Sequence, residues 1–579
     1  MIVDAAEAMR SGGGRSENGN DATPVRKEYG AAAEMIWLCC RNDTALRWKQ
    51  MENLMYILKV KKEKHRYVLE ELVKEFLRPD EYEVVLDEPA EGKGLAEAAE
   101  GFEAGDDAGA EAGTETGAEA GKDVGAETGA EAGKDVGAET GAALGRSVKK
   151  KLTDDERKIE NEERDSEKRR VFDELAKLTG YRPEWGTLTG VRPVKLFNEL
   201  MDSGLSEEET ADVFRKRYYV SEEKISLLAE TYKNQRFVTS VKAGNTVGIY
   251  IGIPFCPTRC LYCSFASNQA SGEAIERYLE ALLIEVAAVG DRMKRFGIIP
   301  ESIYIGGGTP TTLDARQLER LLKLVGDSFD MSHVAEYCVE AGRPDTIDKD
   351  KLEVLRRHNV GRISINPQSM NDRTLELIGR SHKVEDIYDA FRLVKSSGIP
   401  EINTDIIAGL PGEDYDMFMN TLRKVIELDP DNITVHTLAV KRASRLKEQN
   451  ENYHYENAAG VGKMVGDARR LLAEKGYFPY YMYRQKHMAG NYENVSYAKP
   501  GTESIYNIRI MDEHQSIIAL GAGGISKAYY PEENRLERVP NVTNFEIYIQ
   551  RLDEMIERKD KALYEPFKGH DDDAGSLNG

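Results

Sequence analysis

Three cysteines, Cys256, Cys260 and Cys263, stand within the eight-residue stretch Cys-Pro-Thr-Arg-Cys-Leu-Tyr-Cys. They directly follow a short apolar run, residues 247–254, that predicts a strand. Thiols at this spacing can hold one inorganic cluster if the backbone loops around it. Iron–sulfur clusters ordinarily take four cysteine ligands, so one iron here would keep an open position for a substrate or a cofactor.

Two other interpretations of these cysteines are a structural zinc site that lacks one ligand and plain buried thiols. Zinc ribbons usually pair two C-x₂₋₄-C knuckles, and the sequence has no second knuckle, so the spacing favours the cluster. The adjacent pair Cys39-Cys40 would point to opposite faces of a strand, which favours core residues over a redox or metal site. Six cysteines in this arrangement do not make a disulfide framework, and a reducing compartment is expected.

Alternating strand and helix patterns, from Val247 to about Leu438, are the elements that must position the cysteines. The expected strands are 247–254, 302–306, 335–340, 361–366, 401–407 and 432–438, and the expected helices are 273–295, 314–328, 348–358, 383–397 and 413–428. Six such repeats predict a parallel sheet that is curled into a partial or full barrel. In barrels of this kind the functional groups lie at the C-terminal ends of the strands.

Unusual residues occur at these expected strand ends. They are the glycine run Gly306-Gly307-Gly308 before Thr309, then Glu340, Gln368 and Asp405. The glycines let the backbone approach a ligand closely, although they lack the spacing of a P-loop or a dinucleotide fingerprint. Because an unpaired buried carboxylate is costly, Glu340 and Asp405 in apolar strands indicate function rather than solvated charge. Glu340 would pair with an ammonium group, Asp405 with ribose hydroxyls, and Arg380 with a carboxylate.

The remaining chain divides by composition. The expected segments are 1–28 disordered, 29–86 a small N-terminal α/β domain, 87–146 a disordered linker, 147–240 a helical region, 241–440 the barrel, 441–569 a smaller α/β C-terminal domain, and 570–579 a disordered tail. The linker is Gly/Ala/Glu-rich, and its 16 acidic residues against 4 basic ones supply more than half of the net charge of −22. The loop 181–195 is expected either to make contacts or simply to form the turn that opens a helix at Pro193.

Charge and hydropathy limit the classes of function. The acidic balance argues against nucleic acid or an anionic membrane as the main partner. The first 22 residues contain no apolar core of a signal peptide, and no run of 18 apolar residues occurs anywhere in the chain. A cytoplasmic, monomeric protein without a membrane span is expected.

The spacing Cys-x₃-Cys-x₂-Cys, with Tyr250 six residues upstream, resembles the radical S-adenosylmethionine (SAM) superfamily. Within that superfamily, about Thr246 to Lys527 resemble the oxygen-independent coproporphyrinogen III oxidase group. The segments Trp185 to Pro193, Val339 to Pro344 and Gly521 to Lys527 resemble its HemZ-type coproporphyrinogen dehydrogenases.

The resemblance implies a partial (β/α)6 radical-SAM barrel in which Cys256, Cys260 and Cys263 hold a [4Fe–4S] cluster. It also implies that SAM chelates the fourth iron, with one or two SAM molecules bound. The residues that match SAM-contacting positions of the family are Tyr250, Tyr262, Gly307, Gly308, Thr309, Glu340, Gln368, Arg380, Asp405 and Ala439.

The activity implied by the resemblance is a step of haem biosynthesis that runs without oxygen. Reductive cleavage of SAM gives a 5′-deoxyadenosyl radical, which takes hydrogen from a substrate propionate. Loss of a further electron and of CO₂ leaves a vinyl group, and two rounds convert coproporphyrinogen III to protoporphyrinogen IX. External electron donors and acceptors are required. A tetracarboxylate substrate favours cationic anchors, for which the candidates are Lys441-Arg442, Arg192 with Lys195, and Arg484 with Lys486.

Departures from the family pattern leave two alternatives open. Gly252 stands where a histidine is common, and the N-terminal segment that contributes to catalysis in the best-studied branch has no visible counterpart. One alternative is a haem-binding carrier, although that branch carries His-Asn-x-x-Tyr-Trp where this chain has Tyr506 to Met511. The other alternative is a radical enzyme that acts on a different tetrapyrrole.

Overall fold

The computed structural model describes residues 55–79, 81–86, 154–265, 267–440, 444–446, 458–485 and 491–567. The predictions for 1–28, Cys39-Cys40, the linker 87–146, Lys441-Arg442, Lys486 and 570–579 lie outside these residues. The chain forms two compact units, Met1–Leu95 and Ala96–Gly579.

The first unit contains one βαβ motif. Strand β1 (Tyr56–Val60) and strand β2 (Tyr82–Leu86) pair in parallel, with Tyr56 opposite Tyr82, and helix α3 (Arg66–Val73) connects them. The helix buries Leu69, Leu72 and Val73, which is the packing that a crossover helix requires. The boundaries 29–86 of an N-terminal domain remain a prediction.

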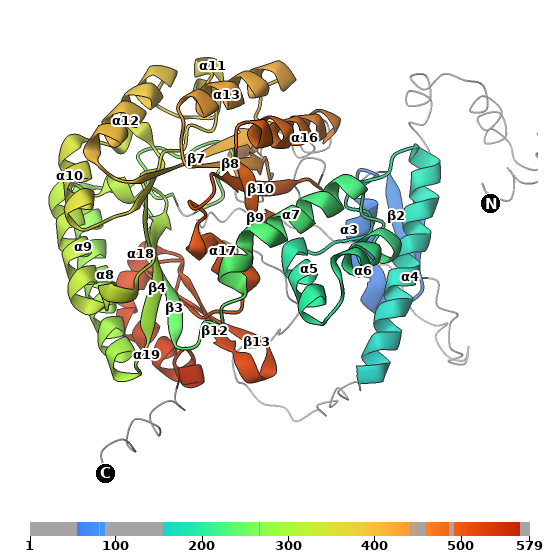
Figure 1. The fold of residues 1–579 in the computed structure, drawn as a ribbon, viewed down its shortest axis with the longest axis horizontal. Coiled ribbons are helices and arrows are strands. Elements are labelled where there is room, and N and C mark those ends of the chain that lie inside the picture. Colours follow the sequence, from blue (N-terminus) through green and yellow to red (C-terminus); the bar gives the residue numbers. More distant parts are fainter. Residues whose placement is uncertain are drawn as a thin grey trace, which may run out of the picture. The chain divides into compact units, whose positions relative to one another are not determined.

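The second unit is built on six parallel strands that pair in sequence order (Figure 1). They are β3 (Thr246–Ile253), β4 (Ile299–Gly307), β5 (Glu336–Glu340), β6 (Arg362–Ser364), β7 (Glu401–Ala408) and β8 (Asn432–Thr437). The connecting helices are α8 (Gly272–Arg295), α9 (Ala315–Ser328), α10 (Lys349–Arg357), α11 (Asp372–Leu377), α12 (Val384–Ser397) and α13 (Tyr415–Glu427). The strands and five of these helices agree with those expected from hydrophobic periodicity, whereas the short helix α11 lies outside the expected ranges. Strands β3 and β8 do not pair with each other, so the barrel is open.

The C-terminal part of the chain extends this sheet at both ends, giving eleven strands in the order β13-β12-β11-β3-β4-β5-β6-β7-β8-β10-β9. The added strands are β9 (Phe478–Arg484), β10 (Glu493–Ala498), β11 (Ile517–Leu520), β12 (Ile525–Tyr530) and β13 (Arg535–Pro540). Strand β11 runs parallel to β3, and β10 runs antiparallel to β8. Within the described residues, the strands of the expected smaller C-terminal α/β domain therefore belong to the same sheet as the core, and the bounds 441–569 remain a prediction. The open edges of β3 and β8 offer unpaired backbone groups that the tail strands satisfy.

Further helices precede and follow the six-strand core. They are α4 (Asp154–Thr179), α5 (Pro193–Asp202), α6 (Glu207–Asp212), α7 (Glu222–Thr239), α16 (Ala458–Glu474), α17 (Ile505–Asp512), α18 (Phe545–Gln550) and α19 (Leu552–Ala562). Helix α4 lies within the expected helical region 147–240, and α6 continues as a π-helix over Val213–Arg217. Among the described residues, no helix has the length and apolar character needed to cross a membrane.

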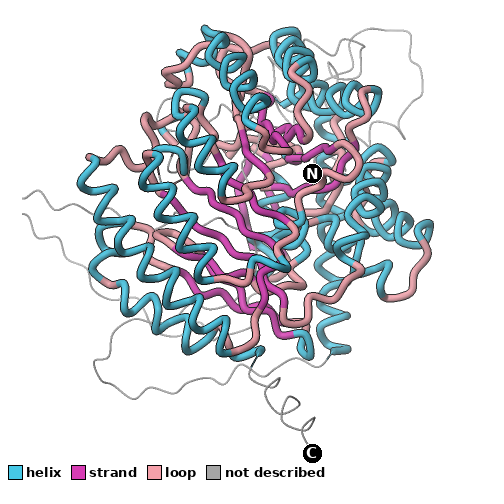
Figure 2. Tube along the Cα trace, turned by 60° about the vertical axis from the view of Figure 1, so that its left-hand side comes forward, coloured by secondary structure: helices cyan, strands magenta, loops and turns pink. Residues whose placement is uncertain are grey.

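The two faces of the sheet differ in character, as the strand period of two predicts. On β3 the side chains of Ile249, Ile251 and Ile253 are fully buried, and they belong to the main hydrophobic core together with residues of the covering helices. The alternate residue Tyr250 points to the opposite, inner face, where its ring stacks on Tyr304. Figure 2 shows helices packed along the band of strands.

The loop before α5 is held by the tail strands. Trp185 donates its indole N–H to Glu493 at 2.8 Å, and Lys224 lies 2.6 Å from the other oxygen of the same buried carboxylate. The backbone N–H of Arg484 donates to the Val191 carbonyl at 2.8 Å. The loop makes contacts and also opens a helix at Pro193, so both expectations for 181–195 are confirmed.

Candidate active site

The three-cysteine loop begins where β3 ends and is fixed by backbone hydrogen bonds. The N–H of Cys256 donates to Asn268 O at 3.1 Å, and the N–H of Thr309, just beyond β4, donates to Phe255 O at 2.8 Å. Farther along the loop, the N–H of Leu261 donates to the carbonyl of Ile378 at 2.9 Å. The loop is therefore attached both to the glycine-rich turn after β4 and to the segment after α11.

Two glycines of this turn stand where other residues would not fit, Gly307 because of its backbone conformation and Gly308 because of the space around it. Gly307 has a φ of +117°, a region that L-residues avoid. A Cβ on Gly308 would lie 2.5 Å from Phe255 O and 3.0 Å from the sulfur of Cys256. The turn therefore passes so close to the first cysteine that only glycine fits there.

The thiols lie close enough to influence one another. The pKa of Cys256 is raised to about 11, mainly by burial; the hydrogen bond with the Thr309 hydroxyl at 3.5 Å opposes this rise, and the nearby thiols of Cys263 and Cys260 add smaller contributions to it. Burial likewise raises the pKa of Cys263. The loop by itself thus favours neutral thiols, and a bound metal is what makes such thiols deprotonate.

Within the described residues, no group of three or more His, Cys, Asp or Glu side chains is arranged to hold a single metal ion. A single zinc ion requires all its sulfur ligands at about 2.3 Å from one point. In a cubic cluster each cysteine binds its own iron atom, so the three sulfur atoms need not lie around one point.

Glu340, at the end of β5, points to the inner face of the sheet. Its carboxylate accepts hydrogen bonds from the Tyr304 hydroxyl at 2.5 Å and from the Gly307 N–H at 3.2 Å. Burial raises the pKa of Glu340 to about 7, helped by the negative charge of Asp405, while the two hydrogen bonds oppose this shift. The side chain therefore lies near its protonation midpoint at neutral pH.

Several buried polar atoms near the cysteine loop have no hydrogen-bond partner among the described residues. They lie in the region of Gln368, Arg380 and Tyr262. Gln368 has a φ of +66°, and its backbone bridges to β7, where its N–H donates to Asp405 O at 3.0 Å. Arg380 donates to Asn366 O at 2.6 Å and to the Tyr262 hydroxyl at 3.4 Å. The side-chain oxygens of Gln368 and Asn366 and the Nε of Arg380 are buried without a hydrogen-bond partner. A polar ligand would satisfy them.

Asp405 lies beside a residue that sequence reasoning missed. The Nε2 of His436, on β8, is 3.6 Å from the carboxylate of Asp405, and both side chains are about one-quarter exposed. His436 could have been noticed as the polar residue at an alternate position of an apolar strand. Ala439, which matches the last family position, is partly exposed just beyond the end of β8.

Stacked tyrosines form part of the inner face. The rings of Tyr250, Tyr304 and Tyr506 stack in a group, with centroids 6.3 Å apart for the first two and 4.7 Å apart for the last two. Burial raises the pKa of each of these phenols. The interior beside Glu340 is therefore aromatic and largely shielded from water.

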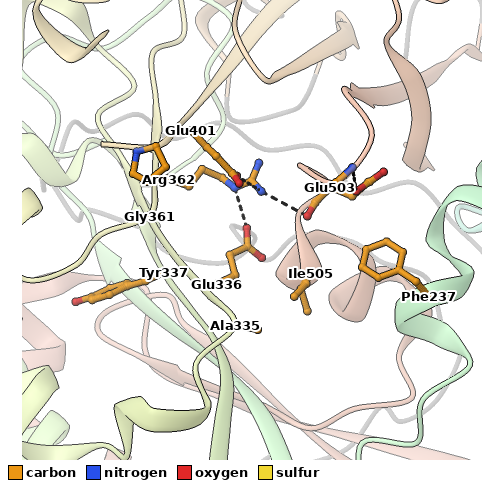
Figure 3. Close-up of a pocket in the computed structure, with 11 residues that line it drawn as sticks. Phe237, Ala335, Glu336, Tyr337, Gly361, Arg362, Glu401, Glu503 and Ile505 are labelled. Carbon is orange, nitrogen blue, oxygen red and sulfur yellow. Dashed lines mark hydrogen bonds and ion pairs between the residues drawn. The ribbon is translucent and has the colours of Figure 1, made fainter. Parts of the chain in front are cut away.

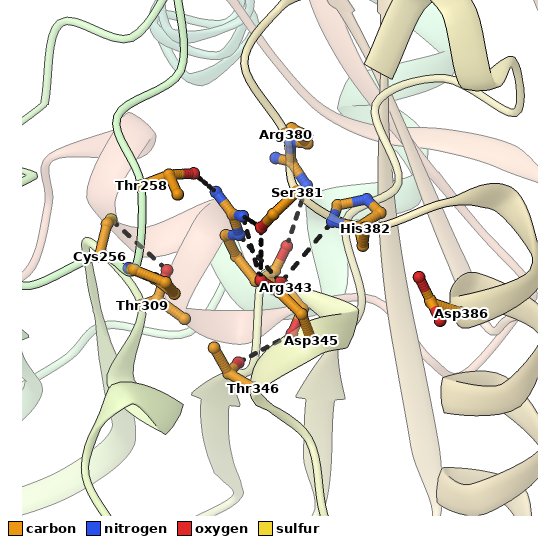
Figure 4. Close-up of polar contacts among 12 residues, drawn as sticks. Cys256, Thr258, Thr309, Arg343, Asp345, Thr346, Arg380, Ser381, His382 and Asp386 are labelled. Atoms are coloured by element: carbon orange, nitrogen blue, oxygen red, sulfur yellow. Dashed lines mark hydrogen bonds and ion pairs between the residues drawn. The ribbon is translucent and has the colours of Figure 1, made fainter. Parts of the chain in front are cut away.

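A second residue that sequence reasoning missed, Arg343, lies behind the cysteine loop (Figure 4). It is 3% exposed, and it binds Asp345 through two nitrogens at 3.1 and 3.2 Å. It also donates to the Thr258 hydroxyl of the loop at 2.7 Å. The signal available in the sequence was an arginine placed three residues after the strand-end Glu340.

Two expected substrate anchors have their charges engaged within the chain. Arg192 and Lys195 both contact the carboxylate of Glu513, which also binds Lys527. Arg484 is buried and donates to the carbonyl groups of Leu188 and Asn491, with its guanidinium over the Trp185 ring. These side chains join the loop before α5 to the tail, which is a structural role that sequence spacing did not indicate.

A cavity of about 470 Å³ lies at the opposite ends of strands β5, β6 and β7 (Figure 3). Arg362 is 4% exposed there and pairs with Glu336 at 3.1 Å and with Glu401 at 2.6 Å. In β/α barrels this N-terminal end is associated with stability, whereas the catalytic groups occur at the other end. The buried ion pairs of Arg362 with Glu336 and Glu401 therefore agree with a structural role for this end of the sheet.

Comparisons with known proteins relate this chain to one superfamily. The Radical SAM superfamily matches residues 250–425. The "Oxygen-independent coproporphyrinogen-III oxidase-like protein HemZ" of Bacillus subtilis is 40% identical over 395 residues, 67% of this chain and 79% of that protein. The "Heme chaperone HemW" of Lactococcus lactis is 32% identical over 285 residues, 47% of this chain and 68% of that protein. The solved structure of coproporphyrinogen III oxidase (HemN) from Escherichia coli aligns with a TM-score of 0.43 and 23% identity, over 56% of this chain and 74% of that one.

The chain belongs to the radical SAM superfamily and, within it, to the oxygen-independent coproporphyrinogen III oxidase group that includes HemZ. Membership implies a [4Fe–4S] cluster and SAM. The residues present fit both groups. The fit consists of three neighbouring thiols, a turn in which Gly308 leaves no Cβ against the first of them, and the unsatisfied polar atoms around Gln368 and Arg380.

Proposed function

We propose that this protein catalyses the oxygen-independent oxidative decarboxylation of coproporphyrinogen III to protoporphyrinogen IX. The observation that carries the proposal is the meeting of three thiols, a glycine-only turn and the partly buried Glu340 at adjacent strand ends of the sheet. The 40% identity to a protein named as an oxygen-independent coproporphyrinogen-III oxidase-like protein supports the choice of substrate.

The residues that would hold the cofactors are those that match the family positions. Cys256, Cys260 and Cys263 would bind the cluster. SAM would be held by Tyr250, Tyr262, Gly307, Gly308, Thr309, Glu340, Gln368, Arg380, Asp405 and Ala439. When bound, the cluster and SAM together supply a carbon radical that removes hydrogen from an unactivated position of the substrate.

The contributions of the chain itself are binding, orientation and exclusion of water. Glu340, held by Tyr304 and Gly307, can accept from an ammonium group or donate a proton at its carboxyl oxygen, because its pKa lies near 7. The orphaned atoms of Gln368 and Arg380 would bind polar groups of SAM. The stack of Tyr250 on Tyr304 presents flat apolar rings to a tetrapyrrole and keeps water from the reacting carbon.

A second candidate is a haem carrier. Its support is the 32% and 30% identity to proteins named "Heme chaperone HemW", with 68% and 69% of those proteins covered. The segment Tyr506 to Met511 argues against it, because it contains no histidine and lies mainly in helix α17, where Tyr506 is buried against Tyr304.

One experiment separates the candidates. The cluster is reconstituted anaerobically, and SAM, a reductant, an electron acceptor and coproporphyrinogen III are added. The oxidase proposal expects a divinyl product and CO₂. SAM cleavage without CO₂ would reject the oxidase and favour another tetrapyrrole substrate, whereas tight one-to-one haem binding without turnover would favour the carrier.

A further inference from the structure

Arg343 contacts the cysteine loop at two points. Its Nη1 donates to the Thr258 hydroxyl at 2.7 Å and approaches the sulfur of Cys260 at 4.0 Å. The Thr258 hydroxyl in turn donates to Gly379 O at 3.2 Å. The residue in the middle of the first cysteine interval is therefore fixed from both sides, and one guanidinium nitrogen serves both Thr258 and Cys260.

The other edge of the guanidinium faces a set of anchoring groups. Nε and Nη2 bind the two carboxylate oxygens of Asp345 at 3.1 and 3.2 Å, and Nη2 also donates to Ser381 at 2.7 Å. Asp345 is held by Ser381 at 2.9 Å and lies 3.7 Å from His382 (Figure 4). Because three hydrogen bonds hold this edge of the planar guanidinium, the positive group cannot turn away from the sulfur.

The charge of Arg343 acts in a buried place. Arg343 is 3% exposed and Cys260 is 8% exposed, so little water screens the 4.0 Å approach. The reduction potential of an iron–sulfur cluster depends on its net charge, on hydrogen bonds to the sulfurs and on solvent exposure. Since uptake of an electron adds negative charge, a fixed cation beside a ligand sulfur favours the reduced cluster.

We propose that Arg343 is a positioning residue that holds the cysteine loop and raises the reduction potential of the cluster, and that Asp345 limits this rise. The proposal rests on the proposed cluster site and does not depend on which tetrapyrrole is the substrate. A purely structural ion pair would stabilise the fold without setting a potential, and the two roles predict different results.

The test uses R343Q and D345N, with R362Q as a matched control. Arg362 is also buried, at 4% exposed, and is also paired with carboxylates, but it lies at the opposite ends of the strands. Each full-length protein is reconstituted anaerobically, and the midpoint potential is measured by a redox titration followed by electron paramagnetic resonance. We expect a more negative potential for R343Q, a less negative one for D345N and an unchanged one for R362Q.

A merely structural role for Arg343 and Asp345 would not shift the midpoint potential in opposite directions in the two variants. The proposal is rejected if R343Q and D345N shift the potential in the same direction, or if neither shifts it. If R343Q takes up no cluster, D345N decides alone, and a potential equal to or below that of the parent rejects the proposal. The titration contains no tetrapyrrole, so absence of decarboxylation would reject only the proposed reaction, whereas a parent protein without a cluster would reject both.

Discussion

The hydroxyl of Tyr304 donates a 2.5 Å hydrogen bond to Glu340, whose pKa nevertheless rises to about 7. Burial of the carboxylate is the largest cause, and the nearby negative charge of Asp405 adds to it, so the hydrogen bond only reduces the shift. A carboxyl group near its midpoint can exchange roles as donor and acceptor at neutral pH. The hydrogen bond between Tyr304 and Glu340 thus connects strand β4 to a titrating carboxyl group at the expected SAM site.

E340Q should change how stability depends on pH. The pKa of Glu340 rises from 4.5 in the unfolded chain to about 7, so the folded state binds the extra proton between these values. The contribution of Glu340 to stability is therefore greatest below pH 4.5 and falls by roughly 1 to 3 kcal/mol as the pH rises to about 7. As the pH rises from 5 to 8, the unfolding free energy of the cluster-free wild type, measured in urea, should fall relative to that of E340Q. Parallel pH profiles would contradict the buried carboxylate.

G308A should prevent the cysteine loop from holding its cluster. The added Cβ would lie 2.5 Å from Phe255 O, so the backbone after β3 must move and carry Cys256 with it. Iron and sulfide content after reconstitution should fall severalfold. G342A is the control, because the nearest atom to its added Cβ is 3.9 Å away on Asn366, and it should load like the wild type. Equal loading of both variants would argue against a tight turn.

C260A should abolish cluster binding and SAM cleavage, since one of the three ligands is removed. C338A is the matched control, because Cys338 is fully buried on β5 and is not part of the three-cysteine loop. It should keep its cluster and lose only about 1 kcal/mol of unfolding free energy. The measurements are iron content and formation of 5′-deoxyadenosine under reducing conditions. SAM cleavage by C260A would refute the ligand assignment.

K224M should destabilise the fold strongly while leaving the cysteine loop intact. Lys224 and Glu493 form a buried pair at 2.6 Å, and the variant leaves the carboxylate buried with only Trp185 as a side-chain partner. Loss of one member of such a pair costs about 3 to 5 kcal/mol. K233M removes an exposed pair with Glu207 and should cost less than about 1 kcal/mol. Similar denaturation midpoints for the two variants would show that the buried pair contributes little.

Local periodicity was enough to predict the six-strand core. The strands from β3 to β8 are apolar runs bounded by turn residues, and the helices between them carry one apolar stripe, so each can be recognised without its neighbours. Glu340 could be singled out for the same reason, as a charged residue at the end of an otherwise apolar strand. Its elevated pKa, however, depends on burial that only the packed structure gives.

Pairing between distant segments could not be predicted in this way. Strands β12 and β13 carry little apolar alternation; β13 is the partly exposed edge strand of the sheet, and β12 lies next to it. The engagement of Arg192 by Glu513 and the approach of Arg343 to Cys260 join residues far apart in sequence. Residue type alone gave no sign of these partners.

The pairing of β11 with β3 has a consequence for how the protein is made. The strand that leads into the cysteine loop is bordered on one side by Ile517–Leu520, which are synthesised long after it. Contacts of such large sequence separation form late, because a long chain must close before they are gained. When the cysteines are synthesised, the two strands that pair with β3, which are β4 and β11, have not yet been made. A cluster delivered to the chain before its C-terminal strands are made would meet a site that is still incomplete.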